Sequence, residues 1–237
     1  MKQSLCNNWE FVTQWTDEFS RGQGNALPVR LPHTAIELPL HCIDHNDYQM
    51  ICGYRRWLSL SPELQGKRLF LQFDGAAHIA TVFVNGHALT THRCGYTAFR
   101  VEISDHVRFG DDNLIAVRLD TTENPTVPPF GFVIDYLTYG GLYREVWLDI
   151  REKEMITDMF VTTPTTDTVH VELSTEGADN YRLSILEEDG TCLLTSQCND
   201  LRLEGAQPWT VESPYRYILQ CQLLDSSGKV VDTQQVK

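Results

Sequence analysis

Residues 79–86, with the sequence IATVFVNG, decide the fold class of this chain. Residues 79–84 are rich in β-branched and aromatic side chains, which is typical of a β-strand. Asn85 and Gly86 follow directly. This dipeptide is the strongest short hairpin signal, because both central positions of the turn need a positive φ. The stretch therefore predicts a strand that turns back on itself in an antiparallel sheet.

The same pattern of short strands and turns continues on both sides of this hairpin. Further strands are predicted at residues 69–73, 97–103, 113–119 and 142–150. Glycines mark the connections between them, at Gly66, Gly110, Gly140 and Gly141. No convincing amphipathic helix interrupts the series, so residues 1–152 are predicted to form an all-β sandwich domain.

A second β-domain is predicted after a short charged run at residues 151–154. Residues 168–173 and 181–186 alternate between apolar and polar side chains, and the latter stop near Asp189 and Gly190. Strands of this length with turns about 8–12 residues apart are typical of an immunoglobulin-like sandwich. Residues 153–237 are therefore predicted to form such a domain.

One segment of the first domain is predicted to be a long surface loop. Residues 123–131, with the sequence ENPTVPPFG, contain three prolines, which remove the donors that a central strand needs. Long loops inside otherwise regular domains are often functional. This loop is therefore the first place to look for a site.

Composition excludes several classes of partner. The formal net charge of −13 repels phosphate backbones and anionic lipid, so neither nucleic acid nor a membrane is an expected partner. The first eight residues lack the apolar run of a signal peptide. The cysteines are odd in number and contain no CxxC pair, which favours reduced, mostly buried thiols and a cytoplasmic location. They are Cys6, Cys42, Cys52, Cys94, Cys192, Cys198 and Cys221.

No local signature of an active site or cofactor is present. The motifs GxSxG, HExxH, GxxxxGK[ST] and GxGxxG are all absent from the sequence. Residues 41–47 (HCIDHND) are the most metal-like cluster, but a metal needs three or four convergent ligands, and a polar loop is the favoured interpretation. We therefore predict no metal and no cofactor.

Trp57 and Trp147 lie in strand-like sequence, where a large ring usually fills the core.

Several weak motifs in the right order resemble glycoside hydrolase family 2. They include LPH at residues 31–33, GYRRW at 53–57, VFVNG at 82–86 and NLIAV at 113–117. Residues 134–146 (IDYLTYGGLYREV) resemble a signature of the family, and residues 208–217 (PWTVESPYRY) resemble a step of its second domain. The resemblance covers nearly the whole chain.

The resemblance implies a jelly-roll sugar-binding domain, an immunoglobulin-like domain and then a (β/α)₈ barrel, expected after residue 237. In this family both catalytic glutamates sit in the barrel and work by the retaining mechanism. The chain alone is therefore expected to be inactive, as the front of a β-glycosidase, with β-galactosidase favoured. Its expected partners are its own barrel, a carbohydrate substrate and further copies of the full-length protein.

The resemblance also assigns substrate-binding residues. Asp135 lies nine residues before Arg144, the spacing at which enzymes of this family carry an aspartate that contacts the sugar. Tyr139 is expected to line the same pocket, and Asn46 to reach it from an earlier loop. Arg144 is expected to fix the loop to the sandwich, and Gly140 and Gly141 to permit a tight turn.

Two other classes of protein remain open from the residues alone, because β-sandwiches serve many functions. One is a stand-alone carbohydrate-binding module, which would bind sugar through exposed aromatic side chains. The other is a structural or interaction protein that uses the sandwiches as spacers.

Overall fold

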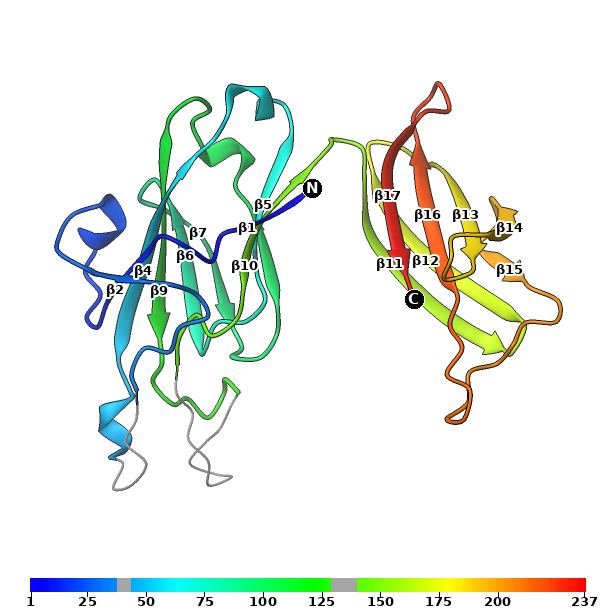
Figure 1. Cartoon of the computed structure of the whole chain (residues 1–237). Helices are drawn as coiled ribbons and strands as arrows, with labels where there is room; N and C mark the ends of the chain where they lie inside the picture. Colours follow the sequence, from blue (N-terminus) through cyan, green and yellow to red (C-terminus); the bar gives the residue numbers. More distant parts are fainter. Residues whose placement is uncertain (38–43, 129–139) are drawn as a thin grey trace. The chain divides into compact units, whose positions relative to one another are not determined.

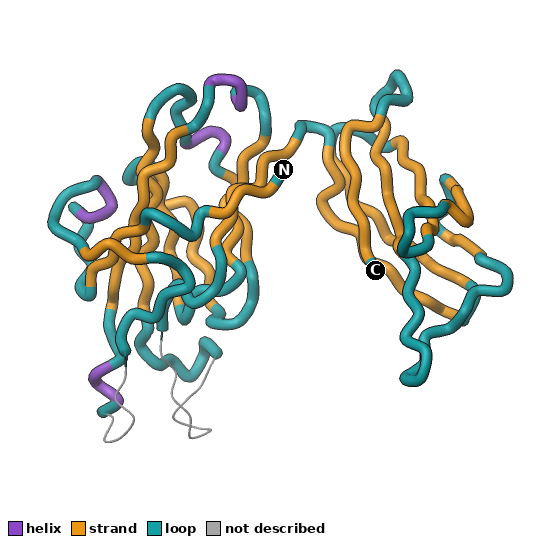
Figure 2. Tube along the Cα trace, viewed as in Figure 1, coloured by secondary structure: helices purple, strands orange, loops and turns teal. Residues whose placement is uncertain are grey.

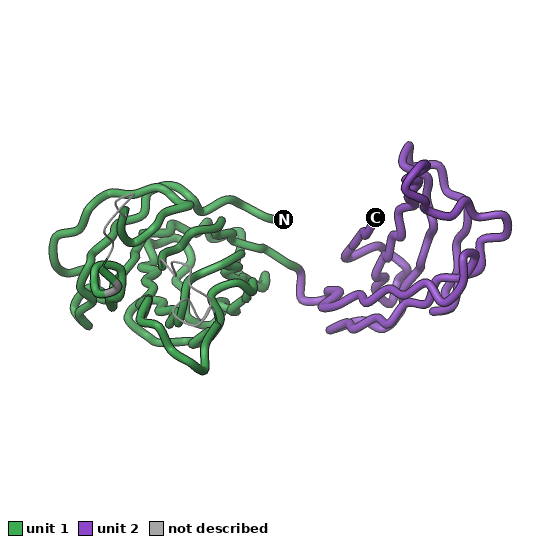
Figure 3. The backbone as a smooth tube through the Cα atoms, turned by 90° about the horizontal axis from the view of Figure 1, so that it is seen from below, with its two compact units in different colours: residues 1–151 green, residues 152–237 purple. Residues whose placement is uncertain are grey.

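The computed structural model describes residues 1–37, 44–128 and 140–237. The chain divides into two compact units, Met1–Arg151 and Glu152–Lys237 (Figure 3). Both are built from β-strands, and the helices within the described ranges are short 3-10 turns of the first unit (Figure 2). This confirms the predicted all-β class. None of the described helices is long and apolar enough to cross a membrane.

The first unit is a sandwich of a six-stranded and a four-stranded sheet, in which all pairs of neighbouring strands are antiparallel (Figure 1). The larger sheet has the order β3 (Leu27–Val29), β2 (Trp9–Val12), β4 (Ile51–Ser59), β9 (Asp112–Asp120), β6 (Ile79–Val84) and β7 (His87–Arg93). The smaller sheet has the order β1 (Lys2–Ser4), β10 (Val146–Arg151), β5 (Arg68–Phe73) and β8 (Phe99–Glu102). Among the described residues, four short 3-10 helices lie in the connections, at Phe19–Arg21, His45–Asp47, Pro62–Leu64 and Ser104–His106.

The hairpin predicted at residues 79–86 is confirmed. β6 pairs with β7, and Val84 lies opposite His87. Asn85 and Gly86 have φ values of 50° and 82°, as a tight two-residue turn requires. The Asn85 side chain also accepts a hydrogen bond from the backbone N–H of Leu114 at 3.0 Å, which ties the turn to β9.

The core of the first unit lies between its two sheets. Along β6, Ala80, Val82 and Val84 are buried while the residues between them are partly exposed, which is the period-2 alternation of a strand with one face on a core. Side chains of both sheets, such as Tyr54 and Leu71, belong to the same apolar cluster.

The structure corrects one prediction about the core. Trp57 is 50% exposed. Successive residues of a strand point to opposite faces, and Tyr54 and Leu58 occupy the core-facing positions of β4, so Trp57 falls on the outer face. Trp147 is partly buried, and its indole N–H donates to the Asp74 carboxylate at 2.7 Å.

The second unit is a smaller sandwich of a three-stranded and a four-stranded sheet. The first sheet has the order β11 (Met155–Thr165), β12 (Thr168–Glu176) and β15 (Asp200–Arg202). The second has the order β14 (Cys192–Ser196), β13 (Asn180–Leu186), β16 (Ile218–Leu224) and β17 (Val230–Val236). Its core is a separate apolar cluster that includes Ile156, Val171, Ile185 and Leu219.

The cysteines of the described ranges are unpaired thiols. Cys6, Cys52 and Cys221 are buried, as predicted, whereas Cys192 and Cys198 are exposed. Cys42 lies outside the described residues.

Candidate functional site

The candidate site lies at one end of the first unit, where β9 ends and the neighbouring strand β4 begins. The predicted site residues lie in the connections that leave this end, at residues 38–50 and 121–142. Thr121 directly follows β9, and Met50 directly precedes β4. One flank of each candidate segment is therefore fixed on neighbouring strands of the larger sheet, which is a common arrangement for functional loops.

Thr121 holds these two connections together. Its side chain is fully buried, and its backbone N–H donates to the carbonyl of Met50 at 2.9 Å. Its hydroxyl accepts from the Met50 N–H at 2.9 Å and donates to the Tyr48 carbonyl at 2.8 Å. One threonine thus satisfies backbone groups that a buried irregular segment would otherwise leave unpaired.

Gly140 and Gly141 pass between three other segments of the chain at the same end. The Gly140 carbonyl accepts from the Ala35 N–H at 2.8 Å, and Gly141 exchanges two backbone hydrogen bonds with Ala77, both of 3.1 Å. The Leu142 carbonyl accepts from the His33 N–H at 2.9 Å. We call the contacts of Gly140 and Gly141 with Ala77, Thr121 and residues 33–35 the glycine clamp.

Only glycine fits at the two central positions of the clamp. A Cβ atom on Gly140 would lie 2.1 Å from the Thr121 Cγ2 atom, and one on Gly141 would lie 2.3 Å from the carbonyl oxygen of His33. Gly141 also has a φ of 147°, which side chains rarely allow. The glycine pair predicted to permit a tight turn therefore allows a close approach of three segments as well.

His78 is buried beside the clamp. Its backbone N–H donates to the Asp120 carbonyl at 3.1 Å, and its Nδ1 lies 3.0 Å from the Thr121 carbonyl. A carbonyl only accepts, so Nδ1 carries the proton and Nε2 presents a lone pair when the ring is neutral. Burial lowers the pKa of His78 below its ordinary value, against smaller opposing effects of the Thr121 bond and the carboxylates of Glu123 and Asp120.

The Nε2 atom of His78 has no hydrogen-bond partner within the described parts of the chain. A buried acceptor without a donor costs about 1–3 kcal/mol, so such atoms are rare in folded proteins. No sequence motif indicated His78 as part of the site. Its two partners, Asp120 and Thr121, lie more than forty positions away along the chain.

The predicted site residues fall partly inside the described structure. Asp135 and Tyr139 lie outside the described residues. Asn46 is exposed, and both its backbone N–H and its side-chain amide donate to the Asp44 carboxylate at 2.9 Å. Asn46 is therefore held in the short helix His45–Asp47, two residues before Tyr48, whose carbonyl accepts from Thr121.

Arg144 lies just beyond the clamp. Its Nη1 donates to the carbonyls of Asp74 and Tyr96 at 3.4 and 3.5 Å, and its guanidinium lies 5.4 Å from the centre of the Tyr143 ring. The Tyr143 hydroxyl in turn donates to the Gly95 carbonyl. These contacts fasten the backbone just before β10 to the segments at Asp74 and at residues 95–96.

Within residues 1–37, 44–128 and 140–237 no three His, Cys, Asp or Glu side chains are grouped so that they could hold a metal ion. Three members of the metal-like cluster in the sequence, His41, Cys42 and Ile43, lie outside these ranges.

Two family models match the chain in tandem. The model described as "Glycosyl hydrolase 2 galactose-binding domain-like" matches residues 34–126, and the model described as "Glycosyl hydrolases family 2" matches residues 148–237. The first lies within the unit that carries the clamp, and the second covers all of the other unit together with the end of β10.

Curated relatives are glycosidases. A β-galactosidase of Thermoanaerobacter pseudethanolicus is 32% identical over 157 residues, which are 65% of this chain and 21% of the relative. A β-glucuronidase of Bacteroides fragilis is 35% identical over 217 residues, which are 84% of this chain and 30% of the relative. The chain therefore spans less than a third of the length of these relatives.

Solved structures share the fold over the full chain. A β-glucuronidase of Ruminococcus gnavus superposes with a TM-score of 0.85 at 24% identity, covering 100% of this chain and 43% of that one. A β-glucuronidase of Lactobacillus rhamnosus has a TM-score of 0.82 at 25% identity, covering 100% and 44%.

Fold and comparisons together define the class of protein. The two units of this chain correspond to the two amino-terminal β-sandwich domains of a group of β-galactosidases and β-glucuronidases. The chain belongs to glycosyl hydrolase family 2.

Proposed function

We propose that this chain is the non-catalytic front of a retaining β-glycosidase that cleaves β-galactosides or β-glucuronides. The observation that carries the proposal is the tandem match of two models of this family, in order along one chain. The relatives are three to five times as long as the parts they share with this chain. We place the two catalytic carboxyl groups in the remaining part, where a separation of about 5–5.5 Å is required for retention.

The first unit contributes binding groups rather than catalytic ones. We propose that the Asp135 carboxylate accepts hydrogen bonds from sugar hydroxyls and that Tyr139 and Asn46 border the same subsite. A carboxylate suits this task because hydrogen bonds to an ionised acceptor are stronger than neutral ones. The glycine clamp and Thr121 support the proposal, because they fix the backbone on both sides of residues 129–139.

The proposal is tested with the full-length protein and nitrophenyl β-galactoside and β-glucuronide. Turnover of either substrate is expected, and none is expected from residues 1–237 alone. Asp135→Ala should lower kcat/KM about 100-fold, which corresponds to about 2.7 kcal/mol of transition-state stabilisation.

Asp111→Ala is the matched control, because Asp111 is an exposed aspartate next to the other end of β9. Its kinetics should stay within twofold of the parent. Unchanged kinetics of Asp135→Ala would remove that residue from the subsite. Absence of turnover of any nitrophenyl β-glycoside by the parent would reject the glycosidase itself.

A further inference from the structure

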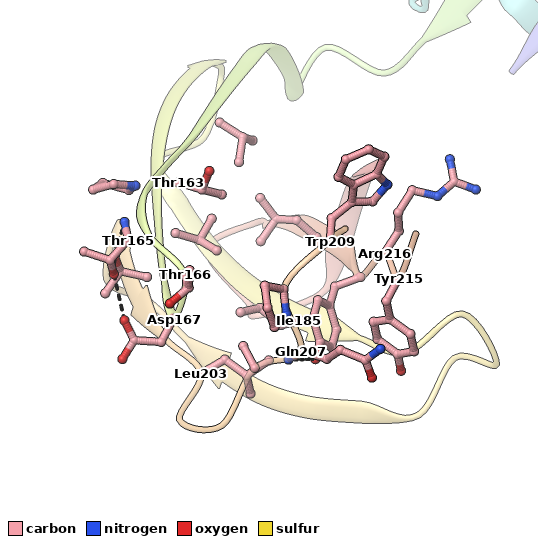
Figure 4. A pocket seen from close by; sticks show the side chains of 18 of the residues that line it. Thr163, Thr165, Thr166, Asp167, Ile185, Leu203, Gln207, Trp209, Tyr215 and Arg216 are labelled. Carbon is pink, nitrogen blue, oxygen red and sulfur yellow. Dashed lines mark hydrogen bonds between the residues drawn. The ribbon is translucent and has the colours of Figure 1, made fainter. Parts of the chain in front are cut away.

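The second unit has an apolar groove that neither sheet covers. It has a volume of about 730 Å³ and opens between the end of β11, the start of β12 and the connection from β15 to β16. Figure 4 shows Trp209, Tyr215 and Arg216 on one side of it and Thr165, Thr166 and Asp167 on the other. The unit therefore exposes part of its interior at this place.

The floor of the groove is continuous with the core of the unit. Ile185 and Leu219 line it and are buried members of the apolar cluster, and Val161 and Val169 line it while packing against that cluster. At the rim the Trp209 side chain is 59% exposed, and Val236 is 40% exposed. Contiguous exposed apolar surface of this kind marks an interaction site.

The connection that carries Trp209 is held in one conformation. The Gln207 N–H donates to the Tyr217 hydroxyl at 2.9 Å, and the Gln207 amide donates to the Ser213 hydroxyl at 3.0 Å. The Tyr215 hydroxyl donates to the Glu187 carboxylate. A large aromatic side chain presented by an ordered loop loses little conformational entropy on binding, as is usual for interface hot spots.

The chemistry of the groove favours polypeptide over sugar. A sugar needs several convergent hydrogen-bonding groups, but Gln207 donates within the loop to Tyr217 and Ser213. The Tyr215 hydroxyl is likewise bonded, because it donates to Glu187 just after β13. The Asp167 carboxylate accepts from the Thr165 hydroxyl at 2.7 Å and from Arg202 at 2.9 Å. What the groove offers is mainly aliphatic and indole surface, which buries the apolar side chains of a protein segment.

We propose that the polypeptide that follows residue 237 in the full-length protein fills this groove and packs on Trp209. The inference rests on the proposed function, in which this chain continues into a longer enzyme. β17 ends at Val236, and both Val236 and Lys237 line the groove. Lys237 Nζ also lies 3.6 Å from the Glu188 carboxylate in the turn after β13. Residues that follow start at the rim, so their docking is intramolecular and favoured by a high effective concentration.

Hydroxyl-radical footprinting with mass spectrometry tests the proposal. We expect Trp209 to be labelled in the 237-residue chain and at least fivefold less in the full-length protein. Phe160 is the internal control, because it is 56% exposed on β11 and does not line the groove. Its labelling should be equal in both proteins. Equal labelling of Trp209 in both, or a full-length protein that ends at residue 237, would overturn the proposal.

Two further arms identify a different occupant. If 10 mM methyl β-galactoside or methyl β-glucuronide protects Trp209 in the 237-residue chain, the groove is a sugar site and the proposal fails. If protection in that chain rises with its concentration together with a dimer mass in light scattering, the occupant is a second copy, and the proposal also fails.

A pair of variants gives an independent readout. Trp209→Ala should lower the Tm of the full-length protein more than that of the 237-residue chain, in which only the already buried part of the ring is lost, whereas Phe160→Ala should have equal effects in the two. Activity on nitrophenyl glycosides is measured separately. A full-length protein that is active but leaves Trp209 unprotected rejects this inference alone, and one that protects Trp209 without activity rejects only the proposed function.

Discussion

A Cβ atom on Gly140 would lie 2.1 Å from Cγ2 of Thr121 and 2.7 Å from the carbonyl oxygen of Ala77. These residues come from three separate parts of the first unit, and no side chain larger than hydrogen fits between them. The contact joins the two backbone positions that flank the predicted substrate loop. Glycine at position 140 is therefore required by the fold next to the candidate site.

Gly140→Ala should destabilise the first unit by about 1–3 kcal/mol, the usual cost of forcing extra volume into packed surroundings. The free energy of unfolding of the 237-residue chain in urea gives the measurement. Adding Thr121→Ser should restore part of the loss, because serine lacks Cγ2 but keeps the hydroxyl that bonds to Tyr48 and Met50. No rescue by the second change would show that the clash lies elsewhere.

Arg55→Lys should also destabilise the first unit. Arg55 is 6% exposed, and its guanidinium donates to the Glu10 carboxylate at 2.6 Å and to the carbonyls of Gln23 and Gly24 at 2.6 and 2.9 Å. A lysine ammonium cannot reproduce this fork, so buried acceptors are left without donors at a cost of about 1–3 kcal/mol. Urea unfolding measures the change. Stability equal to that of the parent would mean that water replaces the lost donors.

Trp9 on β2 and Trp57 on β4 should differ in their contribution to stability. Trp9 is 1% exposed, and Trp9→Ala should cost about 3–5 kcal/mol, as truncation of a buried large ring does. Trp57 is 50% exposed, and Trp57→Ala should cost about 1 kcal/mol, because only about half of its apolar surface is buried in the folded protein. Equal losses in urea unfolding would contradict the outward placement of Trp57.

The stability of the first unit should fall as the pH drops from 7.5 to 5.5. Burial holds the pKa of His78 below its ordinary value of 6.5, so the unfolded chain binds the proton more tightly than the folded one. The stability due to neutral His78 is complete above pH 6.5 and is lost as the pH falls from there toward the folded-state pKa. Burial lowers the pKa of His33 and of His92 as well, so they add to the same trend.

His78→Gln should flatten this pH dependence, measured as the urea midpoint at pH 7.5, 6.5 and 5.5. His87→Gln is the control, because His87 is exposed on β7 and should leave the slope unchanged. A slope that is the same in His78→Gln and in the parent would assign the pH dependence to the other histidines.

Local pattern predicted the candidate site in part. The Gly140–Gly141 pair predicted a tight turn. Its close approach to Thr121, Ala77 and residues 33–35 was not predicted, because these partners come from distant segments. Their identity depends on the pairing of β4, β6 and β9. The burial of His78 has the same origin, since its Nδ1 partner, the Thr121 carbonyl, stands at the end of a neighbouring strand. The roles of Asp135 and Tyr139 stay predictions.

The sequence by itself determined the secondary-structure elements. The turn at Asn85 and Gly86 follows from the φ preferences of these residues, and the strand β6 follows from its period-two alternation. Both effects act within a few residues of the chain, and together they give the all-β class. The tertiary structure decided which face each strand turns inward. Trp57 was predicted to lie in the core because it stands in alternating strand sequence, and only the packing of Tyr54 and Leu58 against the opposite sheet put it outside. The groove beside Trp209 was likewise decided by the tertiary structure, because residues that line it come from β11, β12 and the connection from β15 to β16, which are far apart in the sequence.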